Sequence, residues 1–123
     1  MEENPIRWFE IYVEDMERAK AFYQTVLDYQ FTRADMPGME IWLFPSTMGK
    51  SGAAGALVRM EGVVPGGGGT LIYFGTSDCG VQEANVARAG GRVFKPKTSI
   101  GEYGFISLVY DTEGNLIGLH SMN

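Results

Sequence analysis

The chain has 123 residues, of which 45% are hydrophobic and 20% are charged, as expected for a single globular domain. Fifteen acidic and ten basic side chains give a net charge of −5, and no Lys/Arg cluster is present to neutralise a phosphate backbone, so nucleic acid is not an expected partner. No apolar run is long enough to span a bilayer, so a membrane is not expected either. The acidic start at residues 1–4 lacks the features of a signal peptide, and the one cysteine, Cys79, cannot form an internal disulfide; we therefore expect a cytoplasmic location.

A strand that runs directly into a helix is predicted near the N-terminus. Residues 8–13 are apolar, aromatic or β-branched apart from Glu10, which favours a largely buried strand. Asp15 can cap the helix that follows, and apolar side chains recur at helical spacing from Met16 to Val26. One face of this helix is therefore expected to pack on the strand.

The same unit recurs 63 positions later, from Asp15 to Asp78. At this offset Gly91 corresponds to Asp28, so the match continues through the helix into the next strand. An internal duplication at a fixed offset indicates a repeated structural unit. The second copy predicts a helix over residues 78–89, ended by two glycines.

The remaining elements complete two modules, each with the order strand, helix and three strands. In the first module, strands are predicted over residues 29–33, 40–44 and 53–60, with a turn at residues 35–38. In the second, they are predicted over residues 70–76, 92–94, 105–110 and 115–121, with a turn at residues 111–114. The sequence predicts an α+β fold with module one at about residues 5–60, a flexible linker at about residues 61–69 and module two at about residues 70–123. Two such modules are expected to form a curved half-barrel sheet with the helices outside and a cavity on the concave side.

Three segments of the chain resemble the vicinal oxygen chelate superfamily, which groups glyoxalase I, extradiol dioxygenases, fosfomycin resistance enzymes and bleomycin-binding proteins. They are VEDMERAKAFY at residues 13–23, AGGRV at residues 89–93 and DTEGNLI at residues 111–117. The resemblance covers nearly the whole chain and implies a single glyoxalase-like domain. It also implies a homodimer whose modules pair within one chain or between chains, sometimes by exchange across the linker. It does not define the function, since this superfamily includes isomerases, transferases, oxygenases and metal-free binders.

The resemblance further implies where a divalent metal would be held, namely by side chains from the first and last strands of each module. These positions fall on Trp8, Leu71 and Gly118, and the fourth falls near Gly55. None of these residues is a metal ligand, and the chain contains one histidine in total. Because a divalent ion needs three or four nitrogen or oxygen donors, we expect neither a metal nor another cofactor.

Strand alternation predicts which side chains line the cavity. If Phe9 and Ile11 cover the helix, the alternate residues of the first strand point the other way, and the same parity applies to the second module. The predicted ligand-binding residues are Trp8, Glu10, Tyr12, Leu71, Tyr73, Leu116 and His120. The aromatic side chains among them could equally fill the cavity as part of the core. The Glu10 carboxylate is harder to explain as core, because a carboxylate inside a strand needs hydrogen-bond or charged partners.

Three classes of function follow from this reasoning. The first is a metal-free protein that binds a small molecule in an aromatic cavity. The second is a lyase or isomerase in which Glu10 or His120 moves a proton at a carbonyl substrate. The third is an accessory module whose cavity is filled by its own side chains. The sequence does not identify the ligand.

Overall fold

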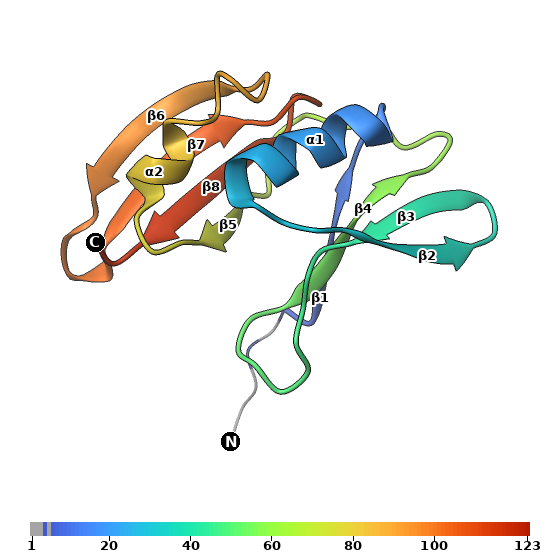
Figure 1. Ribbon diagram of the computed structural model, residues 1–123, viewed down its shortest axis with the longest axis horizontal. Coiled ribbons are helices and arrows are strands. Elements are labelled where there is room, and N and C mark those ends of the chain that lie inside the picture. Colours follow the sequence, from blue (N-terminus) through green and yellow to red (C-terminus); the bar gives the residue numbers. More distant parts are fainter. Residues whose placement is uncertain (1–3, 5) are drawn as a thin grey trace.

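The computed structural model describes residue 4 and residues 6–123 and consists of two consecutive modules (Figure 1). The first module contains β1 (Trp8–Tyr12), α1 (Met16–Leu27), β2 (Thr32–Met36), β3 (Met39–Leu43) and β4 (Ala54–Arg59). The second contains β5 (Ile72–Gly75), α2 (Cys79–Glu83), β6 (Arg92–Ser99), the 3-10 helix η1 (Gly101–Tyr103), β7 (Phe105–Tyr110) and β8 (Leu116–Ser121). The prediction of two tandem modules in an α+β fold is confirmed. Residues 1–3, which belong to the acidic start, lie outside the described residues.

Each module forms its own four-stranded sheet, with the order β1-β4-β3-β2 in the first and β5-β8-β7-β6 in the second. The first and last strands of each module pair in parallel, and the other neighbours pair antiparallel. The helices α1 and α2 contact each other and lie on one side of the sheets (Figure 1). The opposite side of both sheets is therefore not covered by a helix.

The core joins the two modules on the helix side of the sheets. On α1, Phe22 and Tyr23 are fully buried. Around them, the rings of Phe44 and Phe74 lie with their centroids 5.5 Å apart, and Phe9 lies 6.1 Å from Phe74. Each buried side chain of this size contributes about 1.5–3 kcal/mol, so this shared cluster holds the modules together.

The second helix is shorter than predicted. The sequence suggested residues 78–89, whereas α2 ends at Glu83 and continues as turns up to position 90. Hydrogen bonds that span three residues, such as Val86 N to Glu83 O at 3.1 Å, replace the regular helical pattern. Gly80 and Asn85 are weak helix formers, and the apolar stripe of this segment is narrow.

Two strand predictions also need correction. Pro37 and Gly38 form the turn of the first hairpin, and Gly38 has a φ of 80°. The strand before this turn, β2, therefore lies three residues later than predicted. A glycine with positive φ after proline fits a tight two-residue turn. The predicted strand at residues 92–94 extends to Ser99 through Pro96, because β6 is an edge strand that tolerates a proline and shifts register twice.

Within the described residues, no helix is both long and apolar enough to cross a membrane. The expected cytoplasmic location stays a prediction.

Candidate functional site

The candidate site lies on the sheet faces that the helices leave uncovered. In β1, Ile11 is buried against the core, whereas Trp8, Glu10 and Tyr12 alternate with it and lie on the uncovered face. Glu10 is paired with Ala56 of β4. Ala56 is fully buried, so neighbouring side chains already fill the space over it.

The Glu10 carboxylate is held by its two neighbours on the same face. Trp8 Nε1 donates to Glu10 Oε2 at 3.2 Å, and the Tyr12 hydroxyl donates to Glu10 Oε1 at 2.7 Å. The hydrogen bond to Glu10 raises the pKa of Tyr12. We expected these residues to line a cavity; in the single chain Glu10 is exposed and Trp8 is 46% exposed, so this face is open to solvent.

The second module contributes aromatic and polar groups to its own uncovered face. Tyr73 is paired with Gly118 and is 47% exposed. A side chain at position 118 would collide with the Tyr73 ring, so this close approach requires glycine. Leu116 and His120 alternate with Gly118 and are half-buried, as is Leu71, which precedes β5.

The proposed acid and base are not joined in the described part of the chain. His120 Nε2 lies 2.7 Å from the backbone oxygen of Tyr103, in η1. Glu10 contacts Trp8 and Tyr12 instead, and no hydrogen bond or ion pair between described residues links it to His120. The geometry therefore brings Trp8, Glu10 and Tyr12 together and leaves His120 in a separate contact.

A crevice of about 200 Å³ opens beside Glu10 and Tyr12, and the sequence did not predict it. Its other wall consists of linker residues from Val64 to Gly68, with Ile72 and Leu116 from the second module. The linker is fixed there by the Gly66 N–H, which donates to Asn115 Oδ1 at 2.7 Å. The glycine content of the linker predicted only a flexible segment. No signal in the sequence predicted that the linker would line a crevice.

The positions at which the resemblance implies metal ligands do not fit a metal in this chain. Trp8 and Gly118 occupy two of them on the uncovered faces, and neither has a donor. The parallel registers pair Glu10 with Ala56 and Tyr73 with Gly118, so the counterpart of Gly118 is Ala56, the residue next to Gly55. Ala56 has no donor either. Among the described residues, no group of three or more His, Cys, Asp or Glu could hold a metal ion.

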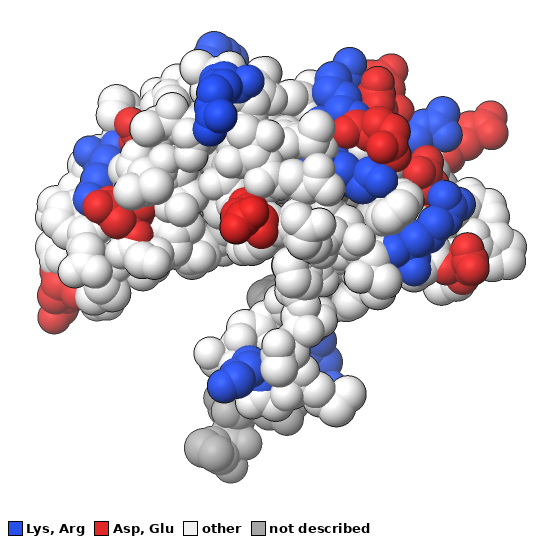
Figure 2. All heavy atoms as spheres, in the orientation of Figure 1, with Lys and Arg blue, Asp and Glu red and all other residues white. Residues whose placement is uncertain are grey.

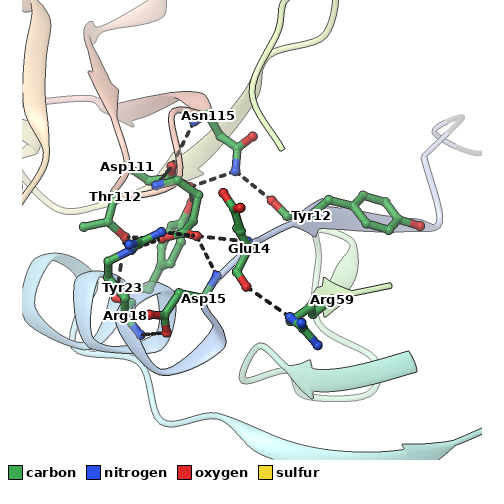
Figure 3. A network of polar contacts seen from close by, with 10 residues as sticks. Tyr12, Glu14, Asp15, Arg18, Tyr23, Arg59, Asp111, Thr112 and Asn115 are labelled. Carbon is green, nitrogen blue, oxygen red and sulfur yellow. Dashed lines mark hydrogen bonds and ion pairs between the residues drawn. The ribbon is translucent and has the colours of Figure 1, made fainter. Parts of the chain in front are cut away.

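A buried carboxylate pair lies on the helix side of the sheets, in the turn after β7. Glu113 accepts hydrogen bonds from the backbone N–H groups of Glu14 and Asp15, both at 2.9 Å, and from Arg18 Nε at 2.7 Å. Burial alone would raise the pKa of Glu113, but the Arg18 and backbone hydrogen bonds outweigh it and lower the pKa to about 2. Figure 3 shows Asp15 and Arg18 converging with the turn residues around Asp111.

Asp111 completes this network and is oriented toward the core. It accepts from the Tyr23 hydroxyl at 2.8 Å and from the backbone N–H groups of Glu113 and Asn115. Burial raises the pKa of Asp111 despite these bonds, and burial also raises that of Tyr23. Asn115 Nδ2 in turn donates to Tyr12 O at 3.0 Å. The sequence indicated only a turn here; its actual role is to fasten the two modules to each other.

Charged side chains do not form a single-sign surface on the face in view in Figure 2, where acidic and basic groups of the described residues are interspersed. The uncovered face of the first sheet is instead apolar around Glu10. Ile41, Ala56 and Val58 form a small buried cluster there, which Tyr12 and Leu43 flank. A ligand that enters this face would meet one carboxylate in an apolar and aromatic setting.

Comparison with known proteins gives matches of fold. Residues 6–41 match the family model described as bleomycin resistance protein-like N-terminal. Glyoxalase I from Zea mays is similar with a TM-score of 0.73 and 20% identity; the match covers 96% of this chain but only 46% of the maize chain, so this chain spans less than half of it. A search of curated proteins finds no significant match in sequence.

Two further solved structures match over nearly their whole length. A glyoxylase/bleomycin resistance protein/dioxygenase domain from Frankia sp. has a TM-score of 0.73 and 16% identity, with 98% of each chain covered. An antibiotic binding protein from Streptomyces sp. has a TM-score of 0.69 and 23% identity, again with 98% of each chain covered. At these identities the similarity establishes the fold, and the function has to be argued from the site.

Proposed function

We propose, from the premise that this chain has the fold of the vicinal oxygen chelate superfamily, that it is a metal-free small-molecule-binding protein. The observation that carries the proposal is the pair of large aromatic side chains, Trp8 and Tyr73, that stand about half exposed on the uncovered sheet faces. Aromatic rings bury a large area when they meet a partner, and exposed apolar patches commonly mark binding sites. The antibiotic binding protein from Streptomyces has the same fold, which is consistent with this use.

The exposure of these rings argues against the accessory module with a filled cavity. If Trp8 were core, its truncation would remove about 3–5 kcal/mol of stability. Because Trp8 is about half exposed, we expect a much smaller loss.

Absence of a metal is part of the proposal and can be measured directly. Trp8, Leu71, Gly118 and Ala56 offer no donor side chain at the family's metal positions. Protein purified without a chelator should therefore contain well under one equivalent of zinc, nickel, manganese or iron, and EDTA should leave its melting temperature unchanged. Stoichiometric metal whose removal lowers the melting temperature would contradict the proposal.

Ligand capture tests the binding function. The protein is incubated with a metabolite extract, separated from unbound compounds by gel filtration and analysed by mass spectrometry after denaturation. We expect a compound that the Trp8→Ala variant loses and that the Val81→Ala variant retains, because Val81 is exposed on α2, away from the uncovered face. Failure of the unmodified protein to enrich any compound would count against small-molecule binding.

The lyase or isomerase alternative has weaker support from the geometry. His120 Nε2 lies within hydrogen-bond distance of the Tyr103 backbone oxygen. No hydrogen bond or ion pair between described residues joins His120 to Glu10. A time course on the captured compound separates the two functions. Unchanged compound supports binding, whereas conversion that Glu10→Gln or His120→Gln abolishes would favour the enzyme.

We also propose a homodimer. Typical ligand pockets measure about 300–1,000 Å³, and the crevice beside Glu10 measures about 200 Å³. A second copy over the uncovered faces would enclose a larger ligand and would cover apolar side chains that one chain exposes. Light scattering that gives a mass near 13.5 kDa at working concentration would refute the dimer.

A further inference from the structure

The Glu10 carboxylate accepts two hydrogen bonds and has no cationic partner among the described residues. Trp8 and Tyr12 each donate one hydrogen bond to it from the same strand face. Within the described residues, none of the ion pairs involves Glu10. A carboxylate with two aromatic neighbours and no counter-ion attracts positive charge, and the net charge of −5 adds to this attraction.

The opposite face of the same sheet contains a matching pair with a cation on its ring. On β3, Trp42 Nε1 donates to Glu40 Oε2 at 3.0 Å, as Trp8 does to Glu10. There, Lys20 Nζ from α1 lies 3.3 Å from the centroid of the Trp42 ring and forms its ion pair with Glu17 at 3.0 Å. The helix thus supplies an ammonium group to the Trp42 pair, and the uncovered face has no helix to do the same for Trp8.

The Glu10 carboxylate and the Trp8 ring are open to a cation from the solvent side, because Glu10 is exposed and Trp8 is 46% exposed. The β4 side chains paired with Glu10 and Tyr12, Ala56 and Val58, are fully buried, so a ligand would lie over Glu10 and Trp8 and not beneath them. The crevice beside Glu10 and Tyr12 includes apolar side chains, among them Val64, Pro65 and Leu116, that a short chain or ring could contact. A cation near Trp8 would gain both charge pairing with the carboxylate and cation–π attraction to the ring.

We infer that the ligand of this face is an organic cation, a protonated or quaternary amine, whose charged group binds at Glu10 between Trp8 and Tyr12. This inference rests on the proposed binding function and specifies the chemical class of its ligand. Anionic ligands are disfavoured at this position by the same carboxylate.

Choline and its neutral isostere 3,3-dimethyl-1-butanol are the probes for a direct test. They have the same shape and differ in the charge of the trimethyl group. Nitrogen–proton correlation NMR reports binding through two indole N–H signals, since the chain has two tryptophans. The Trp42 signal is the internal control, because Lys20 already occupies that ring. We expect choline to shift the Trp8 signal with an affinity on the order of tenfold above that of the alcohol.

Matched variants identify the carboxylate responsible. Glu10→Gln should remove the preference for choline, whereas Glu40→Gln should keep it, because Glu40 belongs to the Trp42 pair on the helix side. An unchanged Trp42 signal in Glu10→Gln confirms that the variant is folded. Equal binding of both probes would overturn the cation inference and leave the binding function intact. If neither probe shifts the Trp8 signal, the cation inference also fails, and the capture experiment decides the binding function separately.

Discussion

The two strand–helix junctions of this duplicated protein have the same cap but different anchors. Asp15 and Asp78 both begin a helix with extended backbone, and each accepts a hydrogen bond from the first turn, at 3.1 Å from Arg18 N and 3.0 Å from Gly80 N. The first helix then runs for 12 residues and the second for 5. Equal caps therefore do not produce equal helices.

The anchors of the two junctions come from different parts of the chain. Glu113 of the second module binds the backbone of Glu14 and Asp15 in the first. The second junction is held within its own module, where Ser121 Oγ accepts from the Cys79 N–H at 2.9 Å and Lys97 pairs with Asp78 at 2.7 Å. The two junctions thus share the fold and the cap, whereas at the first junction Glu113 of the second module accepts hydrogen bonds that the first module donates.

Glu113→Gln should break this cross-module anchor and cause the largest loss of stability. The backbone N–H groups of Glu14 and Asp15 would lose a charged acceptor, and Arg18 would lose its partner. We expect the free energy of unfolding to fall by about 3–5 kcal/mol in urea denaturation.

The matched change in the other junction is Asp78→Asn. Asp78 is exposed enough for solvent to screen its pair with Lys97, so the loss should be clearly smaller. Equal losses in the two variants would show that the junctions are equivalent and that the cross-module anchor has no special weight.

Acid titration should reveal the same anchor in the unmodified protein. The pKa of Glu113 is about 2 in the folded chain against an ordinary value of 4.5, so its stabilisation is fully present above about pH 4.5 and is lost as the pH falls toward 2. Asp111 acts in the opposite direction, because burial raises its pKa and protonation is easier in the folded state.

The measurement is the free energy of unfolding across this acid range for the unmodified protein and for Glu113→Gln. We expect the variant to lose less stability on acidification, because the depressed carboxylate is absent. Parallel curves for the two proteins would mean that Glu113 is not the group whose protonation weakens the fold.

Gly91→Ala tests the tight contact where the second module meets α1. A Cβ at this position would collide with the Tyr110 carbonyl oxygen and the Phe22 ring. We expect a loss of about 1–3 kcal/mol, typical of overpacking against atoms that cannot move aside. Gly75→Ala is the control, since a Cβ there has nothing within 4 Å. Thermal unfolding of both variants compares them, and an unchanged Gly91→Ala protein would show that the contact relaxes freely.

The sequence predicted the fold well, because the helix caps and the repeat that define it can be recognised in short segments of the chain. Asp15 caps α1 as the spacing indicated, and the 63-residue offset places Asp78 at the matching position. The length of α2 was predicted wrongly, because residues 84–90 form turns in a segment whose Gly80 and Asn85 are weak helix formers.

The candidate site was harder to predict for a physical reason. Strand alternation gives the face on which Glu10 lies, but it does not show whether another surface covers that face. Solvent exposure of Trp8 depends on what lies opposite, and this is a property of tertiary and quaternary structure. The Glu113 network escaped prediction for the same reason, because its donors lie more than ninety residues away in the chain.

The smallest expected effect concerns Asp28, the counterpart of Gly91 in the first module. Asp28 ends α1 in the left-handed region, with φ 58° and ψ 37°, and its N–H donates to Gln24 O at 3.0 Å. Glycine adopts this conformation without the strain that a Cβ adds, so Asp28→Gly should relieve part of a strain of about 1–2 kcal/mol. The gain stays below about 1 kcal/mol, because aspartate tolerates this region and glycine increases the entropy of the unfolded chain. Asp28→Ala should instead lower the stability, because alanine has a Cβ, unlike glycine, and does not tolerate the left-handed region as aspartate does. Urea midpoints that rank Ala above Gly would show that the end of α1 is not under backbone strain, and the two helix ends would then differ in packing alone.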